Sequence, residues 1–447
     1  MAEVIIIGGG PAGLAAAGTL AKAGIASTLL EQRATLGGAI HRQPVGSAKP
    51  VAVSTSARHR FERLMQGIAT PLVRLRASTT FLGIDGDGCM LTESRTDGTV
   101  AALKADAVIL ATGAVEKIRP VPGWDLPGVS TAGGLQVMLK ETGTPPKGRV
   151  LLAGNGPLLI ALAAQMIRAG NPPLMIVEAG NPLAHPVAAF GLLAHTTLLR
   201  EATGYTLDVL RSGIPWNRGA CLTGITARDD ALEATILHAD GSTEIVAADR
   251  IALHDGIREN DIGLPAARNN GKPIILKAGD CRQALGVFAA VADGERAGSE
   301  AASLLRGNNA ALTRFERRID RQVAAQRLLA HIFAPALPLP PLSALPDDCT
   351  LCRCEGRTVG DLRALMTVKD GLSGREVKHN GRFAMGSCQG RFCAANTAAL
   401  MAALRPDVPA PTLRDLTGQR WPVRPVSIAA LIGAASNETT NDHEVRS

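Results

Sequence analysis

Short apolar runs, each followed by a glycine-rich turn, recur along the chain and predict buried strands of a parallel sheet. The first run is Val4-Ile5-Ile6-Ile7, which leads into Gly8-Gly9-Gly10-Pro11-Ala12-Gly13. An alanine-rich stretch from Leu14 to Lys22 predicts a helix, and Ser27-Thr28-Leu29-Leu30 predicts a second strand that ends at Glu31. Continuous apolar runs are typical of strands that are covered on both faces. The first 33 residues therefore predict one βαβ unit.

The glycine-rich turn of this unit fits the pattern G-x-G-x-x-G. Gly8 permits a tight turn, Gly10 lets the backbone approach a pyrophosphate, and Gly13 lets the helix pack closely on the strand. The pyrophosphate meets free N–H groups and the helix dipole at the helix N-terminus. Glu31 lies 18 residues after Gly13, where it can accept a hydrogen bond from a ribose hydroxyl. The unit predicts a site for NAD or FAD, and we expect its other lining residues to be Pro11, Ala12, Gln32, Arg33 and Gly38.

A second nucleotide motif follows at residues 149–178. It consists of a strand from Arg149 to Ala153, the turn Gly154-Asn155-Gly156-Pro157-Leu158-Leu159, a helix from Ile160 to Ala169 and a strand ending at Glu178. Leu159 stands where the third glycine or alanine belongs, so the helix must pack differently on its strand. The motif predicts a second Rossmann-like domain with Gly154 and Gly156 as cofactor-binding positions. Three alternatives stay open: NAD(P), another adenine nucleotide, or an empty scaffold retained for docking.

Two more strands end in turns that carry small or acidic residues. Val108 to Gly113 ends in Ala111-Thr112-Gly113, and Ile274 to Asp280 ends in Gly279-Asp280. In this order they resemble signatures of flavoproteins with two dinucleotide-binding domains. The resemblance implies that Thr112 and Gly113 lie against the cofactor, that Asp280 holds a ribityl hydroxyl of FAD, and that residues 286–298 form a helix over the flavin end.

The disulfide reductases of this fold carry a cysteine pair beside the flavin. The corresponding segment here, Leu36 to His41, contains no cysteine, and the second nucleotide domain holds Cys221 alone. The sequence therefore argues against thiol–disulfide chemistry.

Five of the eight cysteines fall between Cys349 and Cys393, whereas Cys89, Cys221 and Cys281 are scattered. Such a cluster indicates metal or redox chemistry rather than structural disulfides. Four thiolates suit either a 2Fe-2S cluster or structural zinc. Zinc sites commonly use C-x2-C pairs, so the C-x-C and C-x4-C spacing found here favours the iron–sulfur cluster, with zinc as the alternative.

Cys352-Arg353-Cys354-Glu355 and the segment from Gly386 to Cys393 resemble the bacterioferritin-associated-ferredoxin-like 2Fe-2S domain. This version of the domain is found in the FAD subunits of heteromeric amine and amino-acid dehydrogenases. That family includes opine oxidases, the hydrogen cyanide synthase flavoprotein and dye-linked proline and hydroxyproline dehydrogenases. The resemblance covers nearly the whole chain. It implies that the cluster is bound by Cys352, Cys354, Cys388 and Cys393, with Cys349 as a spare or as an alternative ligand paired with Cys352.

The order of the motifs predicts an α/β fold with two Rossmann-like dinucleotide-binding domains, the second inserted in the first, and a small helical 2Fe-2S domain. We expect the FAD domain at 1–121 and 247–307, the inserted NAD-binding-like domain at 122–246, and a helical segment with a proline-rich linker at 308–346. The 2Fe-2S domain is expected at 347–409. The tail is expected at 410–447, and its last part, from Ser436, is expected to be disordered.

Charge and composition limit the classes of partner that we expect this chain to bind. The net charge of +7 could suit nucleic acid, but aromatic residues are 3% of the chain and no tract of Lys and Arg occurs, so we expect no nucleic acid. No uninterrupted apolar segment reaches a membrane-spanning length of about 18 residues. The first strand begins at Val4, so we expect no signal peptide and a cytoplasmic protein, with attachment to the inner membrane only through partners.

The resemblance implies a subunit that takes part in dehydrogenation of an amino acid or secondary amine, of the opine, hydroxyproline, proline, sarcosine or glycine type. A flavin-containing beta-type partner would carry the substrate site, and electrons would pass through FAD and the 2Fe-2S cluster to a quinone or a redox protein. We identify no catalytic base in this chain. The alternatives are an NAD(P)H-dependent reductase that feeds a ferredoxin-like acceptor, and a non-catalytic electron-transfer subunit.

Overall fold

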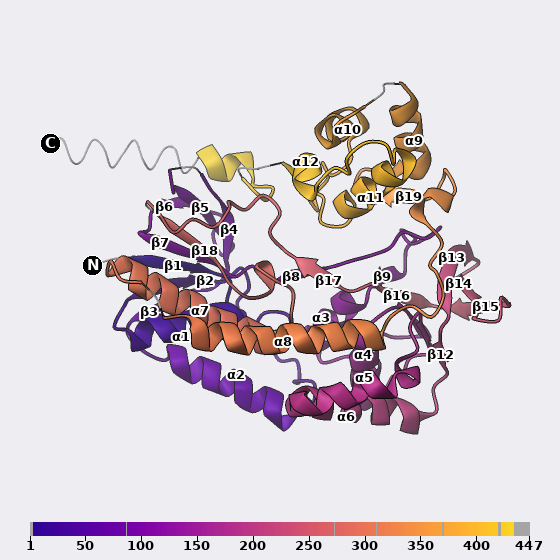
Figure 1. The fold of residues 1–447 in the computed structure, drawn as a ribbon, viewed down its shortest axis with the longest axis horizontal. Coiled ribbons are helices and arrows are strands. Elements are labelled where there is room, and N and C mark those ends of the chain that lie inside the picture. The colour runs from indigo at the N-terminus through magenta and orange to yellow at the C-terminus, as the bar shows by residue number, and fades with distance from the viewer. Residues whose placement is uncertain are drawn as a thin grey trace.

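The computed structural model describes residues 3–85, 87–271, 273–309, 311–368, 371–418 and 422–432. The expected disorder from Ser436 onward lies outside these residues. Figure 1 shows two α/β units joined by long helices and, above them, a smaller, mainly helical unit. We name these the first α/β unit, the second α/β unit and the cysteine unit (residues 347–418).

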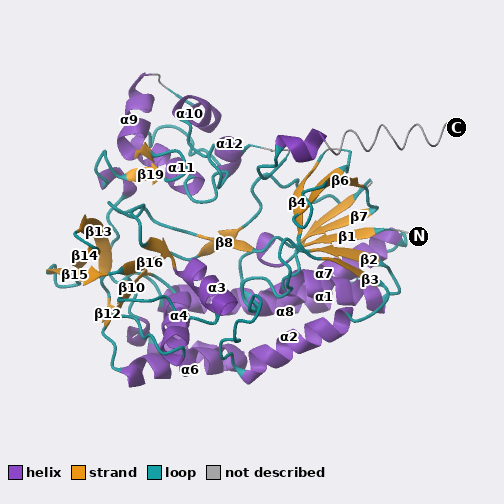
Figure 2. Ribbon diagram, turned by 180° about the vertical axis from the view of Figure 1, so that it is seen from behind, coloured by secondary structure: helices purple, strands orange, loops and turns teal. Residues whose placement is uncertain are grey.

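The first α/β unit is built on five parallel strands in the order β18-β7-β1-β2-β3. Their bounds are β1 (Val4–Ile7), β2 (Ser27–Leu30), β3 (Val73–Arg76), β7 (Ala107–Leu110) and β18 (Ile274–Lys277). One face packs against the helices α1 (Pro11–Lys22), α2 (Thr55–Ile68) and α7 (Val287–Leu305). The other face packs on the antiparallel strands β4 (Thr79–Ile84), β5 (Met90–Ser94) and β6 (Val100–Leu103). Figure 2 shows this layering from behind.

The two-sided burial explains the first apolar run. Val4 and Ile6 join the core beneath the helices, whereas Ile5 and Ile7 join the core beneath the antiparallel strands. Alternate side chains of a strand point to opposite faces, so all four positions must be apolar.

The second α/β unit repeats this plan with the parallel order β12-β11-β10-β16-β9. The strands are β9 (Val129–Thr131), β10 (Val150–Gly154), β11 (Met175–Glu178), β12 (Trp216–Arg218) and β16 (Arg250–His254). Its helices are α3 (Ala132–Thr142), α4 (Pro157–Arg168), α5 (Pro186–Gly191) and α6 (Thr196–Ser212), with the 3-10 turns η1 (Pro182–Ala184) and η2 (Leu192–His195). The strands β13 (Cys221–Arg228), β14 (Ala231–Leu237) and β15 (Thr243–Ala248) form an antiparallel sheet that packs on this unit.

Leu159 is fully buried in the core of the second unit, in one apolar cluster with Leu152 and Leu162. The missing third glycine is therefore accommodated by placing a large side chain between the helix and the sheet.

The boundary that we expected at residue 247 is wrong in position. β16 pairs in parallel with β10 and with β9, so residues 250–254 belong to the second sheet. The chain crosses between the units on a two-stranded antiparallel ribbon, β8 (Ala114–Glu116) with β17 (Ile257–Glu259). A parallel sheet needs this strand beside β10, and the apolar run Ile251-Ala252-Leu253 supplies it.

Helix α8 (Thr313–Ile332) runs from the first unit, where Ile319 packs near α7, to the second unit, where Leu329 and Ile332 are buried. The chain then passes η4 (Leu342–Ala344) and enters the cysteine unit. That unit contains a short antiparallel pair and three longer helices: β19 (Thr350–Cys352), β20 (Arg357–Thr358), α9 (Val359–Val368), α10 (Gly374–Gly381) and α11 (Ala394–Leu404).

The expected boundary between this unit and the tail, at residue 409, lies too early in the chain. The short helix α12 (Leu413–Thr417) inserts Leu416 into the same apolar core as Phe383 and Leu362. Farther on, the Val423 N–H donates to the Leu82 carbonyl at 2.5 Å, so the chain packs back onto the first unit. In the part of the chain that the structure describes, no helix is both long enough and apolar enough to cross a membrane.

Candidate functional site

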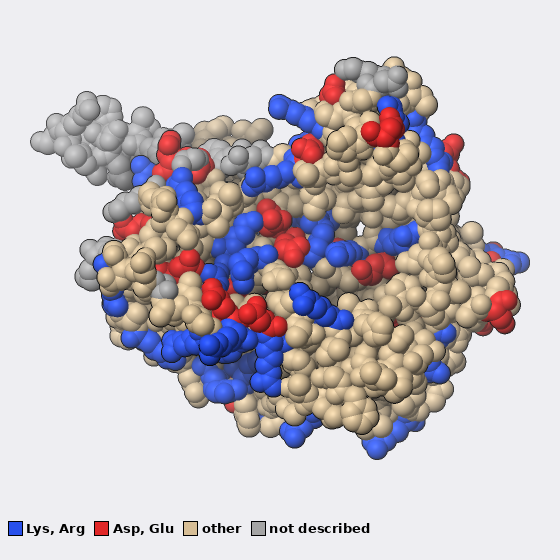
Figure 3. All heavy atoms as spheres, viewed as in Figure 1, with Lys and Arg blue, Asp and Glu red and all other residues tan. Residues whose placement is uncertain are grey.

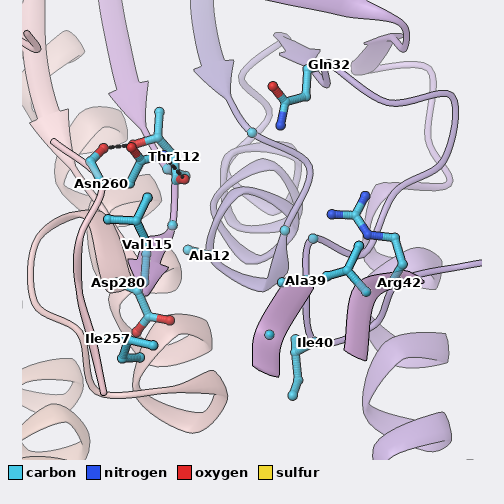
Figure 4. Close-up of a pocket in the computed structure, with 18 of the residues that line it drawn as sticks. Ala12, Gln32, Ala39, Ile40, Arg42, Thr112, Val115, Ile257, Asn260 and Asp280 are labelled. Atoms are coloured by element: carbon cyan, nitrogen blue, oxygen red, sulfur yellow. Dashed lines mark hydrogen bonds between the residues drawn. The ribbon is translucent and has the colours of Figure 1, made fainter. Parts of the chain in front are cut away.

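A cavity of about 770 Å³ opens at the carboxyl ends of β1, β2 and β7. Figure 4 shows Thr112, Asn260 and Asp280 on one side of it, with Gln32 and Arg42 on the other. Most of the predicted cofactor-binding residues line this cavity: Gly8, Gly10, Pro11, Ala12, Glu31, Gln32, Arg33, Gly38, Ala111, Thr112, Gly113 and Asp280. The volume lies in the range of cofactor sites.

The glycine turn forms one wall of the cavity. Gly8 has a φ of +110°, and a Cβ there would lie 2.4 Å from the Ala111 carbonyl oxygen. Gly10 caps α1, and the nearest atom to a Cβ at that position is 3.6 Å away, so its cavity side is open. The N-terminus of α1 therefore faces the cavity with free N–H groups, which favours an anionic group such as a pyrophosphate.

Two of the predicted glycines lie behind the wall instead of lining it. A Cβ on Gly13 would lie 1.9 Å from the Gly8 carbonyl oxygen, so Gly13 sets how closely α1 packs on the turn. A Cβ on Gly279 would lie 2.6 Å from the Ala12 side chain, and the Gly279 N–H donates to Asp293 at 2.7 Å.

Glu31 is held firmly at the end of β2. One carboxylate oxygen accepts from the Gly9 N–H at 2.8 Å and the other from the Arg33 N–H at 2.9 Å. Its side chain is buried yet lines the cavity. Each oxygen has a second lone pair, so the fixed carboxylate remains an acceptor for a ribose hydroxyl.

Asp280 occupies the opposite end of the cavity. Its Oδ1 accepts from the N–H groups of Leu285 and Gly286, at 3.0 and 2.9 Å, just before α7 begins. Burial raises the pKa of this carboxyl, against the two hydrogen bonds that favour the charged form. The side chain is thereby oriented toward the cavity, where it can hold a hydroxyl group.

Several charged residues at the cavity were not identified from the sequence. Glu141 pairs with Arg33 at 2.8 Å and lies 3.7 Å from Arg42, and all three line the cavity. Arg424, from the chain beyond the cysteine unit, lines it as well, and burial lowers the pKa of its guanidinium. These residues come from separate turns and helices, so no local motif could have identified them.

Two further titratable side chains, His41 and Glu116, are each held by contacts within the protein. His41 stacks on Phe61, and burial together with Arg60 lowers its pKa to about 4. Glu116 lines the cavity and is held by His254 Nδ1 at 2.9 Å and by the Gly133 N–H at 2.8 Å. Figure 3 shows that side chains of both signs gather in a band across the middle of the molecule, beneath the cysteine unit.

The four cysteines expected as ligands interact with one another through their thiols. Hydrogen bonds from Cys393 lower the pKa of Cys388 to about 5 and that of Cys352 to about 7, and raise the pKa of Cys393 itself. Cys354 contacts Cys388, although burial raises the pKa of its thiol. Gly386 permits this approach, because a Cβ there would lie 2.3 Å from the Cys354 side chain.

Cys349 stands apart from this set. Burial and the nearby carboxylates of Asp125 and Asp348 raise the pKa of its thiol to about 11. Among the described residues, no three His, Cys, Asp or Glu side chains are arranged to close around a metal ion. The structure brings the thiols of the four expected ligands into mutual contact, with the pKa lowered at Cys352 and Cys388 and raised at Cys354 and Cys393.

Arg391 connects the cysteine loop with the large cavity, which it also lines. Its Nε donates to Oδ1 of Asn260 at 3.2 Å, and its guanidinium donates to the Cys388 carbonyl at 3.0 Å. Asn260 in turn donates to the Thr112 carbonyl at 3.1 Å and accepts from the Thr112 hydroxyl at 2.7 Å through its own carbonyl (Figure 4). The sequence placed Arg391 only within the cysteine motif, because the contact spans 131 residues.

The glycines of the second motif do not line the large cavity. Gly154 lines a separate space of about 80 Å³, and the Gly156 N–H donates to Glu178 at 2.9 Å. Only Leu158 of this turn reaches the large cavity.

The chain is similar to known flavoproteins over most of its length. Residues 2–289 match the model of the family described as pyridine nucleotide-disulphide oxidoreductase. The A-type subunit of opine oxidase from Rhizobium meliloti (strain 1021) is 30% identical, over 95% of this chain and 97% of the relative. The HcnB subunit of hydrogen cyanide synthase from Pseudomonas aeruginosa is 29% identical, over 87% of this chain and 90% of the relative.

Among solved structures, L-proline dehydrogenase from P. horikoshii has a similar fold. Its TM-score is 0.63 at 18% identity, covering 96% of this chain and 79% of that one. The predicted two-Rossmann α/β fold and the suspected family are confirmed. The chain thus belongs to the FAD-binding pyridine nucleotide-disulphide oxidoreductases and, among them, to the subunits of amino-acid and amine dehydrogenases typified by the A-type subunit of opine oxidase.

Proposed function

We propose that this chain is the FAD- and 2Fe-2S-carrying subunit of a heteromeric dehydrogenase for an amino acid or secondary amine. The names of its relatives support this proposal, because the opine oxidase and hydrogen cyanide synthase proteins that it resembles are each named as one subunit of a larger enzyme. The substrate class is that of opines, hydroxyproline, proline, sarcosine or glycine. A flavin-containing beta-type partner carries the substrate site.

The observation that carries the proposal is the hydrogen-bonded connection from Thr112 through Asn260 to Arg391. It joins the wall of the flavin cavity to the loop between Cys388 and Cys393. A flavin bound in the cavity would therefore lie against a wall that is hydrogen-bonded to the loop of the four thiols. A purely structural zinc site would not require such a connection.

The residues of this chain would hold both cofactors. The α1 N-terminus would bind the pyrophosphate, Glu31 would orient the ribose and Asp280 the ribityl chain, in a cavity that Arg33, Arg42 and Glu141 also line. Cys352, Cys354, Cys388 and Cys393 hold the cluster. When bound, these groups supply two-electron and one-electron transfer between the amine and an acceptor.

The overall reaction converts the carbon–nitrogen single bond of the substrate to an imine, with loss of two electrons and two protons. Water then hydrolyses the imine. A quinone or a redox protein accepts the electrons, and a quinone acceptor would place the cytoplasmic complex at the inner membrane through its partners.

The test is the activity of the chain with and without its partner. The chain carries an affinity tag in its native host, and the purified complex is assayed for dye reduction with octopine, nopaline, proline, hydroxyproline, sarcosine and glycine. The isolated, flavin-loaded chain serves as the control. We expect amine-dependent turnover only from the complex. Rapid dye reduction by the isolated chain with NADH would instead support the reductase alternative.

A further inference from the structure

The nucleotide edge of the second α/β unit is covered by the chain itself. The segment 333–345, which we name the linker, passes from the end of α8 across the carboxyl ends of β10 and β11. Asn155 of the glycine turn donates to the Phe333 carbonyl at 2.8 Å, and the Ala336 N–H donates to the Ala179 carbonyl at 2.8 Å. Pro335 and Gly180 form an antiparallel bridge. The contacts at Ala179 and Gly180 directly follow the strand-end acid Glu178.

The two glycine motifs of the chain differ sharply in the space that they face. The first borders a cavity of about 770 Å³. The space at Gly154 is about 80 Å³, and Leu339, Pro340 and Leu345 of the linker form part of its wall. A space of this size falls well below the several hundred Å³ of a typical cofactor site.

Glu178 does not lie where a ribose hydroxyl could reach it. It is fully buried and accepts from the Gly156 N–H at 2.9 Å, whereas its counterpart Glu31 lines the first cavity. Burial raises the pKa of Glu178 to about 8. An acidic side chain that binds a ribose hydroxyl must reach the cavity, and this one does not.

The approach of the linker depends on glycine at position 180. A Cβ on Gly180 would lie 2.9 Å from the Phe333 carbonyl oxygen and 3.0 Å from the Phe333 carbonyl carbon. Both are backbone atoms, which cannot rotate away. The linker is therefore seated directly on the strand end, backbone against backbone.

We propose that the linker occupies the adenosine side of the second motif, so that this unit is a dock for the linker and not a site for NAD(P) or another adenine nucleotide. The docked linker fixes the point at which the chain enters the cysteine unit. Beyond it, the Trp124 indole N–H donates to the Thr350 carbonyl at 2.6 Å, and Asn396 donates to the Ile118 carbonyl at 2.8 Å. The second Rossmann domain thereby positions the cysteine unit over the flavin cavity.

The proposal is tested by hydrogen exchange on the flavin-loaded full chain, in which the first motif is already filled. The amide of Ala336 reports docking because its N–H is bonded only while the linker is seated. We compare the wild type, Gly180→Ala and the matched control Gly204→Ala, which adds a Cβ with no atom within 4 Å in the same unit. Equilibrium dialysis with NADH and with ADP-ribose is run on all three proteins.

We expect protection of the Ala336 amide in the wild type and in Gly204→Ala, and exchange faster by about tenfold in Gly180→Ala, in line with the loss of roughly one hydrogen bond. Neither nucleotide binds the wild type. Three results would each overturn the proposal: exchange of the wild-type amide at the rate of an unfolded peptide, identical exchange in the two variants, or stoichiometric binding of NADH or ADP-ribose to the flavin-loaded wild type.

Discussion

Arg391 Nε donates a hydrogen bond of 3.2 Å to Oδ1 of Asn260, and this contact joins the cysteine loop to the wall of the flavin cavity. Asn260 is fixed on its other side by two hydrogen bonds with Thr112. Arg258 of β17, in the ribbon that connects the two α/β units, donates to the Arg391 carbonyl at 2.6 Å and anchors the loop from a second side. The cysteine loop is thus held at the cavity wall by polar contacts between segments that are far apart in the sequence.

Arg391→Lys is expected to slow electron transfer between flavin and cluster at least several-fold. Lysine cannot reproduce the planar set of donors that reaches both Asn260 and the Cys388 carbonyl. The rate is measured by photoreducing the flavin anaerobically and following cluster absorbance. Arg375→Lys, at an exposed position on α10, is the control. Unchanged flavin and iron content with an unchanged rate would show that the connection has no role in transfer.

Cys388→Ser should abolish the iron–sulfur absorbance, whereas Cys349→Ala should retain it. Cys388 contacts two other cysteine thiols, and its low pKa favours the thiolate that binds metal. Cys349 is buried, and burial with the carboxylates of Asp125 and Asp348, not another thiol, raises its pKa. Its replacement by alanine should cost about 1 kcal/mol of unfolding free energy through lost packing. Iron and acid-labile sulfide per chain are measured for both variants, and loss of iron in Cys349→Ala would make Cys349 a ligand.

Gly13→Ala should remove bound FAD and destabilise the protein by about 1–3 kcal/mol, because overpacking forces backbone shifts. The new Cβ would lie 1.9 Å from the Gly8 carbonyl oxygen and displace the turn that faces the pyrophosphate. Gly67→Ala is the matched control: it lies in helix α2, and the nearest atom to its Cβ is 3.9 Å away. Flavin fluorescence after denaturation quantifies the cofactor. Full FAD content in Gly13→Ala would contradict the assigned role.

Glu178→Gln is expected to change how stability depends on pH. The folded-state pKa of about 8 lies above the ordinary value of 4.5, so the folded protein binds more protons between these values and its stability falls as pH rises through this window. Glutamine cannot ionise but can still accept from the Gly156 N–H. We expect urea unfolding to give a flatter profile for Glu178→Gln across this window. Parallel profiles for the two proteins would show that Glu178 is not buried as described.

Much of the fold could be predicted from the sequence because both nucleotide motifs are local. Contiguous apolar residues predict the strands β1, β2 and β11, and contiguous glycine-rich segments predict the turns that follow β1 and β10. The boundary near residue 247 could not be placed, since β16 is as apolar as a strand of either sheet and only pairing with β10 assigns it. The sequence likewise did not predict that α12 belongs to the cysteine unit, because only the packing of Leu416 in that core assigns it.

In the candidate site, too, the residues of local motifs could be predicted and those brought in by tertiary packing could not. Gly8, Gly10 and Glu31 of the first motif line the cavity, whereas Gly13 lies behind its wall, and the local spacing of the motif fixes all four positions. Arg42, Glu141, Asn260 and Arg424 were missed, because each reaches the cavity through tertiary packing. The second motif shows the reverse case. Its turn and acid are local and recognisable, but the linker that covers them lies more than 150 residues farther on.

We propose that this one chain holds FAD and a 2Fe-2S cluster close enough for electron transfer between them. The most direct measurement is an anaerobic dithionite titration of the full chain, purified without oxygen and followed by visible absorbance and electron paramagnetic resonance. We predict about one FAD, two iron and two sulfide per chain, and a cluster signal that appears on reduction together with flavin bleaching. The account would be contradicted if dithionite bleached only the flavin, no paramagnetic cluster signal appeared and the chain contained zinc.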